Sequence, residues 1–187
     1  MRLFFVLMGL VPALIWAQPQ PDSLRAAFRR QLDRSQARLR VFEKTIEEDG
    51  IRETKRFSPQ RSGGLAAGQT QLQLADELEP ALKLVFADPR LRGEYQISRT
   101  ANHWKALRKP RSAPVDLIEQ EIRYEDRRLR FIRSTYHYDS FLYDIYQTLE
   151  VEFDAQGNYL RHHLSERTVV SLLGIDFRIQ ITGAAVY

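Results

Sequence analysis

Four polar residues interrupt an otherwise apolar series of positions in the C-terminal part of the sequence: Gln120, Arg133, Gln147 and Glu166. When the expected turns set the pairing of the strands, these residues lie on one face, in a row across four neighbouring strands. Burial of an isolated charge is costly, so Arg133 and Glu166 need each other, the amides between them, water or a ligand. The row is either a hydrogen-bonded polar belt or the polar part of a ligand pocket, in which Arg133 would hold an anionic or carbonyl group.

Three further side chains on the same face are secondary candidates for ligand binding: His137, Tyr143 and His162. Neighbours in a strand point to opposite faces, so His162 and His163 cannot share a metal ion, and His137 lies roughly 25 Å from His162. The sequence also lacks the G-x-S-x-G, H-E-x-x-H and phosphate-binding glycine motifs. We therefore assign no catalytic residue and expect no metal and no cofactor. An unrecognised hydrolase remains a third option for the function.

The strands that position these residues are indicated by alternating apolar and polar side chains over about residues 117–182. Turns at residues 126–127, 139–141, 156–157 and 173–174 join five antiparallel strands. They predict that Leu149 pairs with Leu164 on one side and with Phe131 on the other, and that Tyr124 pairs with Leu129. All five strands then share one apolar face. Strands of about ten residues or more indicate a strongly curved sheet or a partial barrel.

Shorter elements precede this sheet. Leu24, Phe28 and Leu32 mark one face of an Arg-rich helix over about residues 23–39. Residues 40–57 then form a hairpin around Asp49-Gly50, although the helix could also continue to Glu48. We expect a mobile loop at residues 58–70, a short helix at residues 80–87 and a strand near residues 95–98. A solvated loop is expected to carry a group of basic residues: Lys105, Arg108, Lys109 and Arg111.

The first 17 residues have the features of a secretory signal peptide: Arg2, an apolar stretch over residues 3–15, and Ala17 before a polar segment. This stretch is shorter than the roughly 20 residues of a membrane-spanning helix, so we expect cleavage and no integral membrane segment. Residues 18–187 then form a single exported domain in a bacterial periplasm or at the cell surface. The absence of cysteine excludes disulfides and a lipid-anchored cysteine. A formal net charge of +4 gives no indication of nucleic-acid binding.

Together these elements predict an α+β protein. Its sheet is a curved antiparallel β-meander, or partial barrel, with at least five long strands in the C-terminal part, packed against the N-terminal helix. The order of elements and the chain length resemble those of the periplasmic lipoprotein-carrier family, a half-barrel that holds acyl chains under a helical lid. The resemblance implies a class of ligand and no role for an individual residue. We expect a non-catalytic protein that binds a lipid, an amphipathic small molecule or an envelope glycan.

The C-terminal strand leaves a second class of function open. Residues 175–185 carry apolar or small side chains at every second position, and the chain ends on Tyr187, a pattern that resembles the last strand of outer-membrane β-barrels. The N-terminal third, with its Arg-rich helix, does not fit such a barrel. A membrane barrel would also place the polar row in the middle of the bilayer, which is costly. A small outer-membrane β-barrel is therefore the alternative.

Overall fold

The structure is a computed structural model, and it describes residues 21–58, 72–78, 81, 85, 93–110, 116–126, 128–171 and 173–187. The predicted signal peptide and almost all of the predicted loop at residues 58–70 lie outside the described residues. Of the predicted helix at residues 80–87, only Ala81 and Val85 are described, and both are buried. Within these described segments, no helix has the length and apolar character needed to cross a membrane.

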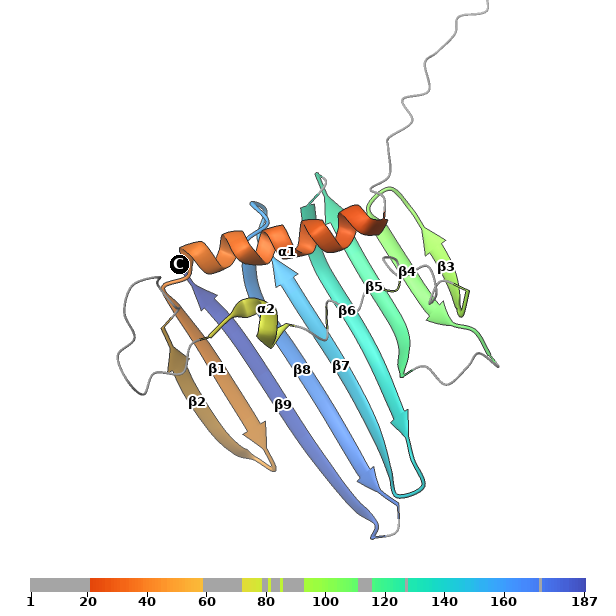
Figure 1. The fold of residues 1–187 in the computed structure, drawn as a ribbon. Helices are drawn as coiled ribbons and strands as arrows, with labels where there is room; N and C mark the ends of the chain where they lie inside the picture. The colour runs from red at the N-terminus through yellow and green to blue at the C-terminus, as the bar shows by residue number, and fades with distance from the viewer. Residues whose placement is uncertain are drawn as a thin grey trace, which may run out of the picture.

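The described residues form two helices and a single antiparallel sheet of nine strands (Figure 1). The sheet is curved (Figure 1). It is also open, because its strand order is β2-β1-β9-β8-β7-β6-β5-β4-β3 and the edge strands β2 and β3 do not pair with each other. The helix α1 lies across one face, so the predicted α+β class and partial barrel are confirmed. The elements are α1 Pro21–Arg38, β1 Val41–Glu48, β2 Ile51–Phe57, α2 Leu74–Glu77, β3 Tyr95–Arg99, β4 His103–Arg108, β5 Leu117–Glu125, β6 Arg128–Asp139, β7 Tyr143–Phe153, β8 Tyr159–Val170 and β9 Ile175–Val186.

The N-terminal hairpin is confirmed, and the alternative of a longer helix is wrong. The helix α1 ends at Arg38, and β1 and β2 are joined at Asp49 and Gly50, with φ angles of 49° and 83°. Both values lie in the left-handed region, which glycine adopts without a steric cost and aspartate more readily than most residues. The Asp49-Gly50 sequence therefore favours a tight β-hairpin over a continuation of the helix.

Strand β4 lies where the sequence predicted a solvated loop, so that prediction is wrong for Lys105 and Arg108. Trp104 and Ala106 alternate with the basic residues and are buried. The ring of Trp104 packs 5.6 Å from that of Tyr124, measured between centroids, and this contact holds the segment in the sheet. Lys109 follows the strand, and Arg111 lies outside the described residues. The short helix α2 was not predicted either.

The predicted register between β7 and β8 is confirmed from Tyr143 to Glu152 and shifts at a bulge beside Phe153, whereas the predicted register between β6 and β7 is wrong. Leu149 pairs with Leu164 as predicted, but on its other side it pairs with Ser134 instead of Phe131. The cause is the turn, which is longer than predicted: β6 and β7 pair as far as Asp139 and Asp144, and the Ser140 hydroxyl bonds to the backbone between them. The partner of Leu149 moves by three residues, and an odd shift exchanges the two faces of a strand.

A β-bulge produces a second change of register, between β5 and β6. Tyr124 pairs with Leu129 as predicted, but the register shifts between Tyr124 and Arg123. Beyond the bulge Arg133 lies opposite Glu121 instead of Gln120. One extra residue in one strand is enough to reverse which side chains face the core, and the sequence carries no clear signal for it.

Two buried polar side chains hold α1 at one end of the long strands. The Gln31 amide donates to the carbonyl oxygens of Leu129 and Gly157, at 3.2 and 3.1 Å, and its oxygen accepts from the Leu129 N–H at 3.0 Å. The Ser35 hydroxyl accepts from the backbone N–H of Tyr159 at 2.8 Å. These backbone groups belong to the ends of β6 and β8 and to the turn between β7 and β8, so α1 is fixed across that end of the sheet.

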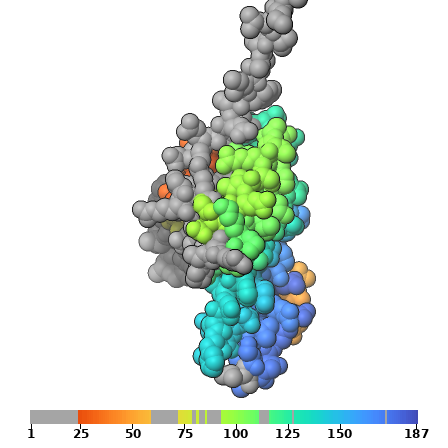
Figure 2. Space-filling model, turned by 90° about the vertical axis from the view of Figure 1, so that its right-hand side faces the viewer, coloured from red at the N-terminus to blue at the C-terminus, as the bar shows by residue number. Residues whose placement is uncertain are grey.

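The position of α1 leaves the other half of the same face uncovered. A helix is about 10–12 Å wide, whereas a strand of 12 residues such as β8 is about 40 Å long. Along β7 the exposure of the face toward α1, called the inner face here, rises from 0% at Val151 to 42% at Tyr143. Figure 2 shows the far ends of the strands, in cyan and blue, extending beyond the part of the molecule that contains β3 and β4, in green. The open inner face consists of Tyr143, Ile145, Gln147, Leu164, Glu166, Thr168, Val170, Ile175, Phe177, Ile179 and Ile181.

The attachment of α1 gives a first testable prediction. Gln31→Leu has nearly the same volume but leaves the N–H of Leu129 and two carbonyl oxygens without their partner, and we expect it to lower the free energy of unfolding by at least about 2 kcal/mol. Urea denaturation measures the change. The matched control is Gln96→Leu, the same substitution at an exposed position of β3, which we expect to stay within about 0.5 kcal/mol of wild type. Equal effects of the two substitutions would contradict the role of Gln31.

Candidate functional site

The predicted polar row is divided between the two faces of the sheet. Gln120 lies on the inner face, opposite Ser134, whereas Arg133 lies on the opposite, outer face. Gln147 and Glu166 are opposite each other on the inner face, as predicted. The predicted pairings of Arg133 with Gln120 and with Gln147 are wrong, because the bulge in β5–β6 and the longer β6–β7 turn each shift the register.

Gln120 has a structural position under the covered part of the sheet. Its side chain is fully buried, donates to the Ser134 hydroxyl at 3.0 Å and accepts from the backbone N–H of Val85 at 2.9 Å. These bonds tie the segment containing Val85 to β5 and β6. An amide with such partners satisfies the requirement that buried polar groups be paired, and it needs no ligand.

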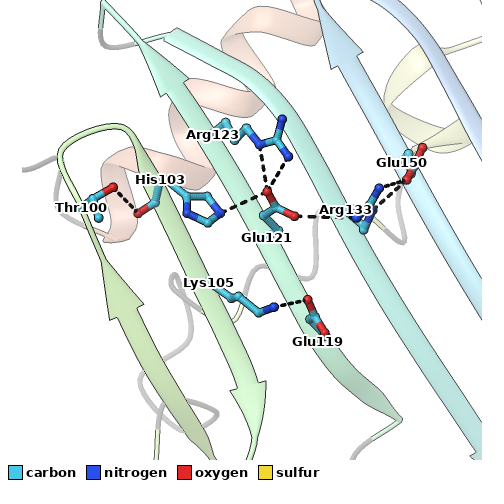
Figure 3. Close-up of polar contacts among 8 residues, drawn as sticks. All are labelled: Thr100, His103, Lys105, Glu119, Glu121, Arg123, Arg133 and Glu150. Carbon is cyan, nitrogen blue, oxygen red and sulfur yellow. Dashed lines mark hydrogen bonds and ion pairs between the residues drawn. The ribbon is translucent and has the colours of Figure 1, made fainter.

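Arg133 belongs to a network of charges on the outer face (Figure 3). Its guanidinium group lies 2.6 Å from the Glu150 carboxylate and 3.9 Å from that of Glu121. Glu121 also accepts from Arg123 at 2.8 Å and lies 3.1 Å from the His103 ring. The sequence holds a signal for this network that the predicted register concealed, since oppositely charged side chains occupy the outward positions of three neighbouring strands.

This outer network is balanced in charge. Burial raises the pKa of Glu121, but the hydrogen bond and the charge of Arg123, together with His103 and Arg133, outweigh it, so its pKa lies below the ordinary value. Lys105 and Glu119 form a further pair at 2.8 Å, which makes three carboxylates against three permanent cations. Such a network neutralises itself and offers no strong field for a charged ligand.

The open inner face contains the only part of the predicted row that the structure brings together. The Gln147 amide donates to one oxygen of the Glu166 carboxylate at 3.2 Å, and the Thr168 hydroxyl donates to the other at 3.3 Å. In the described part of the chain, Glu166 forms no ion pair. Its carboxylate is half-buried among apolar neighbours and is held by two long hydrogen bonds, which is weak compensation for a charge in such a position.

A second carboxylate lies in the same cross-strand row. Ile179 of β9 pairs with Glu166 on one side and with Glu48 of β1 on the other. Two strand spacings separate the backbones of these two acidic residues by about 10 Å. Glu48 is exposed and, like Glu166, forms no ion pair with a described residue. This cross-strand row of the inner face is therefore apolar and acidic.

The secondary candidates occupy three different environments. Tyr143 lies at the exposed end of the open inner face. His137 lies on the outer face, where its ring stacks on that of Tyr146 with 4.4 Å between centroids and lies 3.5 Å from the Asp144 carboxylate. His137 therefore does not share a face with His162, contrary to the prediction. The same odd shift of β6 that moved Arg133 moved His137 as well.

His162 is buried beneath α2, at the boundary between the covered and the open inner face. The Tyr159 hydroxyl lies 2.9 Å from the Gly183 carbonyl oxygen and 2.8 Å from the Nδ1 of His162. A carbonyl only accepts, so we assign the Tyr159 proton to that bond and the Nδ1 proton of His162 to the Tyr159 oxygen. The Nε2 of His162 then faces the Glu77 carboxylate, 4.0 Å away, which is also paired with Lys44.

This buried group resembles an acid–base site in composition, but substrate has no access to its reactive atoms. The side chain of His162 is 3% exposed and Tyr159 is fully buried. Burial lowers the pKa of His162 to about 4, although the Glu77 charge acts in the opposite direction. A Cβ at Gly183 would lie 2.3 Å from the His162 ring, so the packing here is as tight as a protein interior allows. We regard the group as a neutral, packed element of the core.

The lowered pKa of His162 predicts how stability depends on pH. Between about pH 6.5 and pH 4 the unfolded chain protonates this histidine and the folded chain does not, so acidification favours unfolding, by up to about 3 kcal/mol. His162→Gln keeps a donor for Tyr159 and removes the titration. We expect it to lose most of the difference in unfolding free energy between pH 6.5 and pH 4. His163→Gln, at the neighbouring outer-face position, should keep that difference, and the idea fails if the two variants behave alike.

Comparisons of the chain with protein-family models, with curated proteins and with solved structures found no significant match. The features from which a function can be argued are therefore those of the molecule itself. They are a charge-balanced outer network, a packed histidine at the edge of the core, and an apolar open inner face with Glu166, which forms no ion pair with a described residue.

Proposed function

We propose that this protein is an exported, non-catalytic binding protein that holds an apolar or amphipathic molecule against its open inner face. The observation that carries the proposal is the exposure of apolar side chains on the same sheet face that forms the core. Phe177 and Ile175 are 40% and 39% exposed, and Tyr143 is 42% exposed. Contiguous apolar surface of this kind is uncommon on a protein without a partner and typically marks a binding site.

The strands make this surface suitable for an elongated apolar group. Side chains of β7, β8 and β9 lie side by side in rows, for example Ile145 beside Thr168 and Thr168 beside Phe177. Successive rows on one face are about 7 Å apart along a strand, so the open inner face extends over several rows. An acyl or aryl chain lying along the strands would remove both its own surface and these side chains from water.

The polar part of the ligand is expected to be a cation or a hydrogen-bond donor. Arg133, expected from the sequence to hold an anionic group, lies on the outer face and is paired with Glu150. The charge on the open inner face is instead the carboxylate of Glu166, with Glu48 two strands away. A carboxylate only accepts hydrogen bonds, so an ammonium or guanidinium group would complete its coordination and an anionic group would be repelled.

Binding of an apolar probe tests the location of the site. N-phenyl-1-naphthylamine becomes fluorescent in apolar surroundings, and we expect wild-type protein to bind it. The double variant Tyr143→Ser, Phe177→Ser removes two exposed rings from the open inner face and should weaken binding by about tenfold or more. Because both rings are about two-fifths exposed, the fold should persist, which circular dichroism and urea denaturation would verify.

A matched control lies on the same strand. Tyr146 is 45% exposed but points to the outer face, so Tyr146→Ser should leave probe binding unchanged. Arg133→Leu, also on the outer face, should leave it unchanged too. Binding that is lost with either outer-face variant and retained by the inner-face variant would place the site elsewhere and overturn the proposal.

A second experiment tests the chemistry of the head group. Dodecyltrimethylammonium, dodecyl maltoside and dodecyl sulfate share one apolar chain and differ in charge, and each can be measured as a competitor of the fluorescent probe below its micelle concentration. We expect the ammonium compound to compete best and the sulfate worst. Glu166→Gln keeps a polar side chain of the same size and should reduce this preference by about fivefold or more. An unchanged preference would contradict the assignment to Glu166 while leaving the apolar site in place.

A further inference from the structure

Two neighbouring turns, β6–β7 and β8–β9, lie at the end of the sheet away from α1 (Figure 1). Large apolar side chains are exposed in both turns. In the β6–β7 turn Phe141 is 86% exposed and Leu142 is 50% exposed, and in the β8–β9 turn Leu173 is 69% exposed. The two turns lie side by side at the same height along the strands. Tyr143 pairs with Val170, and the Ser171 N–H donates to the Leu142 carbonyl oxygen at 3.2 Å. We call Phe141, Leu142 and Leu173 the apolar tips.

The turns at the α1 end of the sheet have the opposite character. Their described residues are polar or small: Thr100, Ala101, Asn102, Asp126, Asp154, Ala155, Gln156 and Gly157. Polar residues and glycine are the usual composition of turns, because turns lie in water and use side chains that bond to their own backbone. The β1–β2 turn, at the same end as the apolar tips (Figure 1), also has this usual composition, with Asp49 and Gly50. The different composition of the β6–β7 and β8–β9 turns therefore indicates contact with an apolar medium or a partner at the apolar tips.

The backbone of the apolar tips is largely paired within the turns. The Ser140 N–H donates to the Tyr143 carbonyl oxygen at 3.0 Å, and the Ser140 hydroxyl accepts from the N–H groups of Leu142 and Tyr143, at 3.3 and 3.1 Å. The Leu173 N–H donates to the Val170 carbonyl oxygen at 3.1 Å. Turns that satisfy their own N–H groups can leave water at little cost, which is the condition for entering a lipid environment.

The charges near the apolar tips do not suit an anionic surface. Asp139 and Asp144 flank the β6–β7 turn, and Asp176 follows the β8–β9 turn. Arg167 is bound to Asp176 at 2.8 Å, so it is not free to meet lipid phosphates. A surface that attracts these tips must therefore do so through apolar contact and not through net charge.

We propose that the apolar tips insert into the surface of a lipid bilayer and hold the protein there with α1 directed away from the membrane. A bilayer fits better than a protein partner, because each partner in a stable protein interface buries about 800 Å² of continuous surface. The described residues of the two turns present three apolar side chains at their tips, which are too few for such an area. Residues at membrane surfaces are, by contrast, typically isolated aromatic and aliphatic side chains at exposed tips. This inference goes beyond the proposed ligand site and does not depend on it.

Fluorescence of an introduced tryptophan tests the orientation. Phe141→Trp places the reporter in the apolar tips, and Ala155→Trp places it in an exposed turn at the other end. Wild-type protein, in which Trp104 is 1% exposed, provides the background emission. With phosphatidylcholine vesicles we expect a blue shift and quenching by brominated acyl chains for Phe141→Trp and neither change for Ala155→Trp. Equal quenching of both reporters, or of neither, would overturn the proposal.

Co-sedimentation with the same zwitterionic vesicles tests the interaction itself. The double variant Phe141→Ser, Leu173→Ser should reduce the partition coefficient by about tenfold or more, and raising NaCl from about 0.1 M to about 1 M should not weaken wild-type binding. Loss of binding in high salt, or a second copy of the chain bound at the tips in sedimentation velocity, would overturn the proposal. The variant should bind N-phenyl-1-naphthylamine like wild type, so failure of membrane docking is distinguishable from failure of the ligand site.

Discussion

The attachment of α1 through Gln31 and Ser35 is the constraint on which the rest of the molecule depends. Both side chains bond to backbone groups at the ends of β6 and β8 and in the turn between β7 and β8, and such buried bonds are costly to break. The helix can therefore cover only the end of the sheet at which these groups lie. Because the strands are more than three times as long as a helix is wide, an apolar sheet face continues beyond its cover.

The two faces of the uncovered half differ in how they meet water. On the outer face, charged side chains of neighbouring strands pair with one another, as Arg167 does with Asp176 and Arg133 with Glu150. On the open inner face, isoleucine, valine and aromatic side chains surround Glu166, whose hydrogen bonds are few and long. The charges of the outer face are thus paired within that face, whereas the described residues supply neither an apolar cover for the open inner face nor a cation for Glu166. This asymmetry is the physical basis for locating a ligand there.

The sequence was sufficient to predict the helix and the long strands. It was not sufficient to predict on which face of the sheet each side chain of β5 and β6 lies. Alternation of side chains predicted the long strands, and the short β7–β8 turn was enough to pair Leu149 with Leu164. The face to which Arg133 belongs depended on the length of the β6–β7 turn and on a bulge beside Arg123, and each shifted the register by an odd number of residues. The predicted pairing was therefore correct for Gln147 with Glu166, which depends on one turn, and wrong for Arg133, which depends on two more.

The apolar tips lead directly onto the open inner face. Tyr143 follows Leu142 directly and pairs with Val170, and Val170 pairs with Ile175, so these side chains lead from the tips to Glu166 without a charged residue between them. An amphiphile drawn from a bilayer at the tips would move along this face without exposing its apolar chain to water. Its head group would stop where the first carboxylate is reached, at Glu166, and beyond that row Leu149 is already buried toward α1. The fixed position of the helix thus sets the length of chain that the face can hold.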